Sequence, residues 1–486
     1  MTAELNHRAE ADNLITGRPT GLWSLSLTEV WERFSFYGLQ SILTFYLLYS
    51  VADGGLALEP ATAVGIVGAY GGCVYLAQLP GAWLADRVFS PRTMVVIGGT
   101  VIMLGHIALA FVPGIAGLIA GLTMVSLGTG GLKTSITATV GILYNNRTQE
   151  DRDAGFSYFY MALAIGSVAG MVCVGFTQSR WGFHVAFGLA ILGMAAALAQ
   201  YVTTMRSLPA ESGIVKNPIG RAHLGYLIVG VALTCVIVVI AAVSGLVRGS
   251  NINFVIGAVI VVVFIASITR ILRSADATPA EKRRVRGYVP MWIAASVFFG
   301  LSGQIFTTVP LLITERVNLD VGGWHVPEAW LSVVGAVALI VAAPLMASVF
   351  KSSRLGLART TTKYVIGISV TSIAFFMLIL TELWPGRTVS PFFVAACLIV
   401  AGVSEVLVGP IGLSLATRIA PQRFASQMVA LQILTLGAGA TIYGALGELF
   451  TKIPTGYFFC LVGVLGVVAA AVLAGFSRRI ERLIEI

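Results

Sequence analysis

Long apolar runs separated by short polar segments recur along the whole chain. A membrane hydrocarbon core of about 30 Å needs roughly 20 consecutive apolar residues in a helix, and the runs have about this length. They lack the strict alternation of apolar and polar positions that is typical of a transmembrane β-strand. The pattern therefore predicts an all-α membrane protein with 14 transmembrane helices. The expected spans lie near residues 25–51, 62–84, 93–113, 114–143, 155–178, 183–204, 222–247, 251–272, 286–316, 328–350, 361–383, 390–416, 424–450 and 454–476.

The spacing of these runs groups them into six, two and six. Polar segments bracket the central pair, which carries almost no charge and is expected to face lipid. In the second of these segments, Thr278, Pro279 and Glu281 predict a helix start with a capping box. The expected organisation is a cytoplasmic tail (1–24), a six-helix bundle (25–205), a linker with two additional helices (206–285), a second six-helix bundle (286–476) and a cytoplasmic tail (477–486).

The composition agrees with a membrane protein and indicates its orientation. Hydrophobic residues make up 57% of the 486 residues and charged residues only 11%, against about 25% charged in soluble domains. Most of the 31 lysine and arginine residues fall in loops that are cytoplasmic if the N-terminus is cytoplasmic. We therefore expect a multi-pass protein of the cell membrane with both termini in the cytoplasm. The net charge of +9 then reflects topology and contact with membrane lipid, not nucleic-acid binding.

Several classes of function are disfavoured. The five cysteines are scattered singly, so they indicate neither disulfides nor a metal site. The chain has no G-x-S-x-G or H-E-x-x-H motif, and its GTGGLKT stretch has the wrong glycine-to-lysine spacing for a phosphate loop. We expect no enzyme activity, catalytic residue, cofactor or metal. A receptor is also a distant alternative, because the loops leave little room for a folded extramembrane domain. A monomeric carrier is favoured.

Two six-helix halves with a long connection resemble the major facilitator superfamily, in which the substrate site lies between halves that rock against each other. The stretch GAWLADRVFSPR, residues 81–92, resembles the loop signature of that superfamily. Its Asp86 and Arg87 are expected to act in gating, locking and releasing one closed state. The alternative is an ordinary charged turn.

Charged residues interrupt the first apolar run. Glu29, Glu32, Arg33, Tyr37 and Gln40 fall on one face of a helix, within an arc of roughly 140°. Because a charge at the centre of a membrane helix costs about 2.5 to 3.5 kcal/mol, this face is expected to point toward protein or water. Two carboxylates beside one guanidinium form a proton switch in outline: if the guanidinium moves to another anion, one carboxylate can take up a proton. The alternative is a static ion cluster, although a buried ion pair adds little net stability over apolar packing.

The stretch TEVWERFSFYG resembles the E-x-x-E-R-F-x-Y-Y-G signature of the proton-dependent oligopeptide transporter family, which belongs to the major facilitator superfamily. Further stretches resemble the same family across nearly the whole chain: GTGGLKTSITATVGILY, RDAGFSYFYM, TPAEKRRV and SEVLVGPIGLSLATRIAP. The resemblance implies a fold of two six-helix bundles with two extra helices between them.

The resemblance also implies roles for individual residues. Glu29, Glu32 and Arg33 match the proton-coupling trio, and Tyr37 and Tyr75 match tyrosines that line the pocket. Lys133 matches a lysine of the fourth helix, and Glu405 matches the acid of the tenth helix that faces the amino end of the substrate. Lys133 is also expected to act in gating. The residues expected to contact substrate are Arg33, Tyr37, Gln40, Tyr75, Lys133, Gln304, Glu405 and Gln432. The chain departs from the family pattern at Gln40, Ala164, Gly303, Gly335 and Gln432, so a wider pocket with fewer hydrogen-bond donors is expected.

These residues fit a zwitterion. Arg33 and Lys133 supply positive charge for a carboxylate, and Glu405 supplies negative charge for an ammonium. An extended dipeptide or tripeptide spans about 7 to 10 Å and would bridge the halves. The expected function is proton-coupled symport of small peptides by alternating access. The alternative is a proton-coupled carrier of the same fold for another small anion or zwitterion, such as a modified peptide, a peptide-like natural product or a drug.

Overall fold

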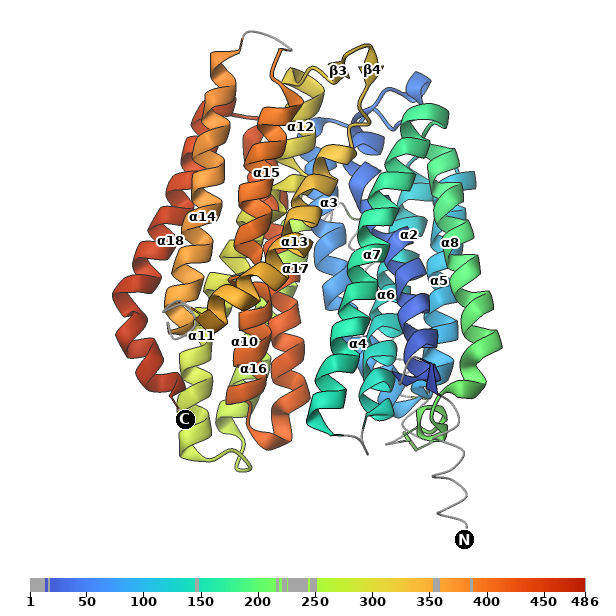
Figure 1. Ribbon diagram of the computed structural model, residues 1–486, viewed down its shortest axis with the longest axis vertical. Coiled ribbons are helices and arrows are strands. Elements are labelled where there is room, and N and C mark those ends of the chain that lie inside the picture. The colour runs from blue at the N-terminus through green and yellow to red at the C-terminus, as the bar shows by residue number, and fades with distance from the viewer. Residues whose placement is uncertain are drawn as a thin grey trace. The chain divides into compact units, whose positions relative to one another are not determined.

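A computed structural model describes residues 14–15, 18–144, 148–215, 218–220, 225, 244, 251–352, 359–384 and 388–485. Figure 1 shows a bundle of helices within each of the two compact units into which the chain divides. Unit 1 comprises residues 1–42 and 77–247, and unit 2 comprises residues 43–76 and 248–486. The expected span at 222–247 lies outside the described residues, apart from Gly225 and Ser244.

Helices account for most of unit 1. The first, α2 (Thr20–Leu48), passes from unit 1 into unit 2 after Ile42. The other elements of unit 1 are β1 (Leu14–Ile15), β2 (Arg18–Pro19), α4 (Gln78–Arg87), α5 (Pro91–Phe111), α6 (Gly114–Leu143), α7 (Gln149–Trp181), α8 (Phe183–Thr204), η2 (Met205–Ser207) and η3 (Ala210–Gly213).

Unit 2 holds the remaining helices. They are η1 (Val51–Asp53), α3 (Pro60–Leu76), α10 (Ile252–Arg273), α11 (Pro279–Ser302), η4 (Gly303–Phe306), α12 (Thr308–Arg316), α13 (Trp330–Ser352), α14 (Thr360–Ile379), η5 (Leu380–Leu383), α15 (Pro391–Glu405), α16 (Gly409–Ile419), η6 (Gln422–Phe424), α17 (Ala425–Phe450) and α18 (Thr455–Ile484). Residues 43–76, which include α3, therefore belong to the same compact unit as the second half of the chain.

The membrane-protein prediction is confirmed at a coarse level. Among the described residues, 11 helical segments are long and apolar enough to cross a membrane. The charged helix α2 and the shorter apolar helix Trp330–Met346 are not among these 11. The total of 14 and the arrangement as two bundles remain predictions, as do the domain boundaries.

Several expected spans are interrupted helices. The span near 62–84 is divided into α3 and α4 at Ala77, and the span near 390–416 is divided into α15 and α16 after Glu405. The span near 286–316 changes from α11 to the 3-10 turn η4 and then to α12. Gly409 and Pro410 explain the start of α16, because proline is compatible with the first turn of a helix but not with its interior.

Two short antiparallel hairpins lie outside the apolar spans and were not expected from the hydrophobic pattern. Strand β1 pairs with β2, and β3 (Asp320–Val321) pairs with β4 (Trp324–His325). The turn between β3 and β4 consists of Gly322 and Gly323, with φ of 60° and 83°. Glycine adopts these left-handed conformations without a steric penalty, which suits a tight hairpin turn.

The predicted capping box at the start of α11 is confirmed. The Thr278 hydroxyl accepts a hydrogen bond from the Glu281 backbone N–H at 3.3 Å. In return, the Thr278 backbone N–H donates to Glu281 Oε2 at 2.8 Å. Pro279 occupies the first turn, where its missing N–H is not needed. This helix therefore begins before the membrane-spanning part that the apolar pattern marks.

Candidate functional site

Glycines bring α2 and α7 into backbone contact, which fixes the orientation of the charged face of α2. A Cβ atom at Gly166 or Gly170 of α7 would overlap the backbone oxygens of Val30 or Phe34. On α2, a Cβ at Gly38 would lie 2.5 Å from the side chain of Val174. Because these backbones approach so closely, α2 has little freedom to rotate and turn its charges toward lipid.

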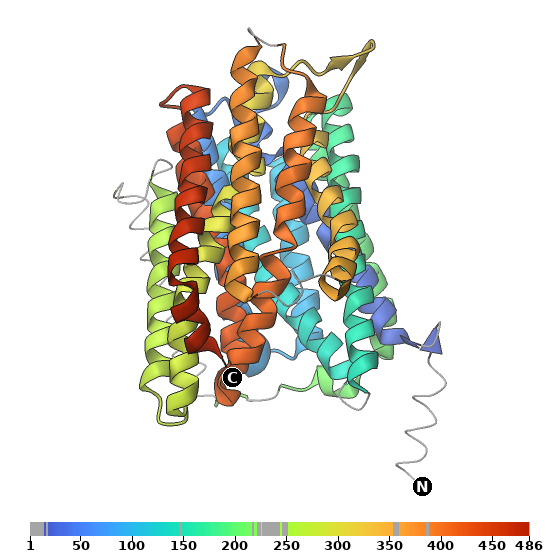
Figure 2. The ribbon, with the colours of Figure 1, turned by 60° about the vertical axis from the view of Figure 1, so that its left-hand side comes forward.

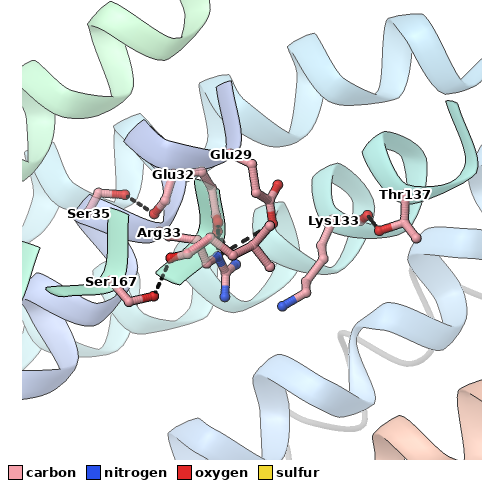
Figure 3. A network of polar contacts seen from close by, with 8 residues as sticks. Glu29, Glu32, Arg33, Ser35, Lys133, Thr137 and Ser167 are labelled. Atoms are coloured by element: carbon pink, nitrogen blue, oxygen red, sulfur yellow. Dashed lines mark hydrogen bonds and ion pairs between the residues drawn. The ribbon is translucent and has the colours of Figure 1, made fainter. Parts of the chain in front are cut away.

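The three charges of α2 form an asymmetric cluster (Figure 3). Arg33 binds Glu32 through two atoms: Nη2 donates to Oε1 at 2.6 Å, and Nε donates to Oε2. Glu29 is farther away, with 3.6 Å between its Oε1 and Arg33 Nε. All three residues are at most 2% exposed. Neither carboxylate oxygen of Glu29 has a hydrogen-bond donor among the described residues. Glu32 therefore holds the guanidinium, while Glu29 is the less constrained carboxylate.

Lys133 supplies a second positive charge to this cluster. Glycines of α6 let this helix pack closely on its neighbours: a Cβ at Gly128 would lie 2.5 Å from Gly98 O of α5, and Gly130 packs on the backbone of Ala77. The glycines of GTGGLKT thus serve helix packing. Figure 3 shows the Lys133 ammonium and the Arg33 guanidinium directed to the same side of the cluster. Lys133 interacts electrostatically with Arg33 and both glutamates, but it forms no ion pair within 4.0 Å in the described part of the chain.

Tyr37 and Gln40 continue the same face of α2. The Arg33 guanidinium carbon lies 5.8 Å from the centre of the Tyr37 ring and 4.8 Å from that of Phe36, within the range of cation–π contacts. Gln40 is 5% exposed, and its Oε1 accepts no hydrogen bond from any described residue. The structure therefore brings Glu29, Glu32, Arg33, Tyr37 and Lys133 together as expected, with Gln40 farther along the helix.

Tyr160 is a member of this site that the sequence reasoning did not single out. It lies on α7, is 51% exposed and interacts electrostatically with Glu29. The stretch RDAGFSYFYM contains it, but several aromatic residues there gave no reason to prefer one. Only the packing of α7 on α2 brings Tyr160 within electrostatic range of this carboxylate.

In unit 2, Glu405 is the last residue of α15, directly before the break that precedes α16. Its neighbour Ser404 shares a hydrogen bond of 2.6 Å with Thr371 of α14, which holds the end of α15 in place. Within the described residues the carboxylate of Glu405 has no ion-pair partner. A half-buried carboxylate without a partner can bind an ammonium group.

Gln304 and Gln432 form structural hydrogen bonds in this conformation. Gln304 Oε1 accepts hydrogen bonds from Thr307 Oγ1 at 3.2 Å and Thr308 Oγ1 at 3.0 Å, which stabilises the turn η4. Gln432 Oε1 accepts a hydrogen bond from Tyr288 Oη at 2.8 Å. Both glutamines are at most 5% exposed. Their expected role in substrate binding remains a prediction.

Tyr75 lies on α3, one residue before its end. A Cβ at Gly437 of α17 would lie 3.1 Å from the Cβ of Tyr75, so the two helices are in close contact here. The Tyr75 side chain is half-buried. Within unit 2, α3 therefore presents this tyrosine from a position fixed by α17.

Comparisons with known proteins agree with these observations. The model of the POT family matches residues 92–462. A di-/tripeptide transporter of Lactococcus lactis subsp. lactis is 31% identical, over 96% of this chain and 97% of that protein. The chain belongs to the POT family. Transport, rather than enzyme activity, is therefore the function of its class, and the family predicted from the motifs is confirmed.

Solved structures of POT proteins are similar over nearly the whole chain. A mutant of the peptide transporter POT in complex with alafosfalin has a TM-score of 0.89 and 32% identity, and the match covers 97% of this chain and 96% of that one. A POT family transporter in complex with 5-aminolevulinic acid has a TM-score of 0.90 and 27% identity, covering 96% and 98%. Both bound molecules are small.

One departure from the POT pattern has a structural explanation. A Cβ at Gly303 would overlap the ring of Tyr443, and a Cβ at Gly71 would overlap the phenol oxygen of the same residue. Tyr443 therefore occupies the space that a side chain at position 303 would need. The space at position 303 is therefore filled, and the wider pocket remains a prediction. Tyr443 is 140 residues away in sequence, so the sequence alone did not indicate that its ring fills the space beside Gly303.

The expected gating residues Asp86 and Arg87 lie at the end of α4, and their side chains are exposed. The distance between Arg87 Nε and Asp86 Oδ2 is 3.9 Å. The backbone oxygen of Arg87 accepts a hydrogen bond from Ile219 N at 3.0 Å, and Arg92 Nη2 donates to Leu208 O at 3.0 Å. The loop is thus tied to the segment that follows the first six expected spans. Its gating role remains a prediction.

Proposed function

We propose that the protein is a proton-coupled symporter of dipeptides and tripeptides that works by alternating access. It lies in the cell membrane with both termini in the cytoplasm and acts as a monomer. Membership of the POT family and the peptide transporters among its relatives support this proposal. The observation that carries it is the asymmetric cluster of α2, in which Glu32 holds Arg33 while Glu29 has no hydrogen bond to any residue that the structure describes.

The proposed coupling follows from this asymmetry. A substrate carboxylate that approaches Lys133 and Arg33 competes with the glutamates for the same positive charges. Glu29 interacts more weakly with Arg33 than Glu32 does, because its Oε1 lies 3.6 Å from Arg33 Nε. It is therefore the first carboxylate to lose its compensating charge. A buried carboxylate that loses its counter-charge favours the protonated form. Substrate binding and proton uptake at Glu29 are therefore linked.

Each end of the peptide is proposed to meet an opposite charge. Arg33 and Lys133 of unit 1 bind the carboxylate, with Tyr37 and Gln40 beside them. Glu405 of unit 2 binds the amino group, and Tyr75, Gln304 and Gln432 contact the rest of the molecule. Asp86, Arg87 and Lys133 act in gating.

The test is uptake of labelled dipeptides and tripeptides into proteoliposomes with a more acidic exterior. We expect accumulation above the external concentration that a protonophore abolishes. The matched variant is Glu29→Gln, which keeps the pair of Glu32 and Arg33 and should still exchange substrate but should not accumulate it. Accumulation by this variant, or accumulation that survives the protonophore, would contradict proton coupling.

The second candidate is a carrier for another small zwitterion. The related structure with 5-aminolevulinic acid supports this candidate, because that molecule carries an amino and a carboxyl group but no peptide bond. The departures at Gln40, Gly303 and Gln432 point the same way. Competition decides between them: if no peptide in the panel inhibits uptake of a zwitterion that is transported, the peptide assignment is wrong.

A further inference from the structure

The additional helix α10 packs on the main helices through one polar side chain. Asn253, near the start of α10, is only 1% exposed. Its Nδ2 donates a hydrogen bond of 2.8 Å to Thr441 O of α17. Its Oδ1 lies where two helices cross: a Cβ at Gly68 of α3 or at Gly444 of α17 would be 2.7 Å from it. The two glycines therefore leave the space that the amide of Asn253 occupies.

The crossing of α3 and α17 is itself a backbone contact. A Cβ at Gly68 would lie 2.6 Å from the Cα of Gly444 and 2.8 Å from Ala440 O. Small residues allow membrane helices to approach this closely. The position of α3 therefore depends on the side chains that pack it against α17. Asn253 is inserted at this crossing and hydrogen-bonds one of the two helices.

Farther along α10, Ile256 contacts α3, and Ile260 contacts both α3 and α17. A Cβ at Gly72 of α3 would lie 2.7 Å from Ile256 Cγ2 and 3.6 Å from Ile260 Cδ1. A Cβ at Gly437 of α17 would lie 3.4 Å from the same Ile260 atom and 3.1 Å from the Cβ of Tyr75. Ile260 is fully buried. The contacts of α10 thus extend to the place where α17 supports Tyr75.

A third contact joins α10 to α11. The Phe264 and Trp292 rings stack with their centres 3.8 Å apart and their planes at 15°. Trp292 Nε1 in turn donates a hydrogen bond of 2.8 Å to Leu431 O of α17. Figure 2 shows α10 at the edge of unit 2, next to α11. The opposite side of α10, with Val262 64% exposed, has no such contacts among the described residues. The expectation that this helix only faces lipid is therefore wrong for one side of it.

We propose that α10 is a positioning element of the transporter: through Asn253 and Ile260 it holds α3 against α17 and so fixes Tyr75 for substrate binding. The proposal rests on the proposed function in one respect, the contact between Tyr75 and substrate. It assigns a role in substrate affinity to a helix outside both expected six-helix bundles.

The test is a double-mutant cycle on the half-saturation concentration for dipeptide uptake. Asn253→Leu removes the amide but keeps a side chain of similar size, and Ile260→Ala removes the contact with Gly72 and Gly437 and serves if the first variant does not fold. We expect either change to raise the half-saturation concentration about threefold or more, the scale of an interhelical contact in a membrane protein. Val262→Ala on the opposite side is the matched control and should change nothing.

The partner variant in the cycle is Tyr75→Ala. If α10 acts through Tyr75, Asn253→Leu should have little further effect on affinity once Tyr75 is gone. An equal effect of Asn253→Leu with and without Tyr75, or no effect in either background, would overturn the proposal. If Tyr75→Ala alone leaves the affinity unchanged, the substrate contact assigned to Tyr75 fails instead.

A second measurement reports the position of α3 without substrate. Cys73 lies two residues before Tyr75, is partly exposed, and can be kept as the single cysteine. Its rate of alkylation by N-ethylmaleimide should change in Asn253→Leu or Ile260→Ala and stay the same in Val262→Ala. Unchanged alkylation in both test variants would overturn the positioning role whatever the transport data show.

Discussion

The two glutamates of α2 should respond differently to neutralisation, because only one of them is hydrogen-bonded to Arg33. Glu29→Gln leaves the bidentate pair of Glu32 and Arg33 intact. The interaction that it removes acts over 3.6 Å and amounts to about 5 kcal/mol before desolvation at an effective dielectric constant of about 20. Since a neutral amide is also easier to bury than a carboxylate, we expect little net change in stability.

Glu32→Gln removes the stronger partner. It replaces charge-assisted hydrogen bonds, each contributing about 1.5 to 3 kcal/mol, with weaker ones. Glu29 remains within 3.6 Å and can still compensate the guanidinium, which limits the loss. The double variant leaves Arg33 without a carboxylate on α2, and breaking a buried ion pair in this way costs about 3 to 5 kcal/mol. The expected order of stability is wild type and Glu29→Gln, then Glu32→Gln, then the double variant.

The assay has two readouts on the same purified variants. Thermal unfolding in detergent, followed by tryptophan fluorescence, gives the order of stability. Proteoliposome uptake gives coupling, where Glu29→Gln should lose accumulation driven by a pH gradient while it retains substrate exchange. The reasoning is refuted if Glu29→Gln lowers the unfolding temperature as much as Glu32→Gln does, or if Glu29→Gln still concentrates substrate.

Three further outcomes are expected. Glu405→Gln should lower the affinity for peptides with a free amino end more than the affinity for acetylated peptides. Lys133→Ala should leave the affinity for peptides with an amidated carboxyl end unchanged. Competition assays measure both affinities, and equal losses for capped and free peptides would count against this assignment. One proton per peptide, driven by about 100 mV and one pH unit, supplies roughly 3.7 kcal/mol, so steady-state accumulation should not exceed about 500-fold. Gly170→Ala should lower the unfolding temperature because its Cβ would overlap Phe34 O, whereas Gly188→Ala, in open space, should not.

Much of this molecule could be predicted from the sequence because hydrophobic length and helix-end chemistry are local signals. The apolar runs at 114–143 and 183–204 coincide with α6 and α8, and Thr278 and Glu281 form the predicted cap. The cluster of Glu29, Glu32 and Arg33 was also predictable, since charges inside an apolar run have few acceptable surroundings.

The remaining features depend on contacts between residues far apart in sequence. Nothing near Gly303 indicates that the ring of Tyr443 fills its place, and nothing near Asn253 indicates that Gly68 and Gly444 leave room for its amide. A polar residue at the start of an apolar run is normally taken as a helix end at the membrane surface. Its burial at a helix crossing becomes evident only when α3, α10 and α17 are assembled.

Helix α2 is held by separate contacts in each of its two parts. Glu29, Glu32 and Arg33 lie in the part of α2 that belongs to unit 1, whereas Thr44 lies in the part that belongs to unit 2, where its hydroxyl donates to Phe306 O at 2.5 Å and where Tyr49, just beyond the helix, donates to Glu328. The glycine contacts with α7 oppose rotation of the first part, and these hydrogen bonds hold the second. A change in the partner of Arg33 therefore acts on a helix that is anchored at both ends in different surroundings.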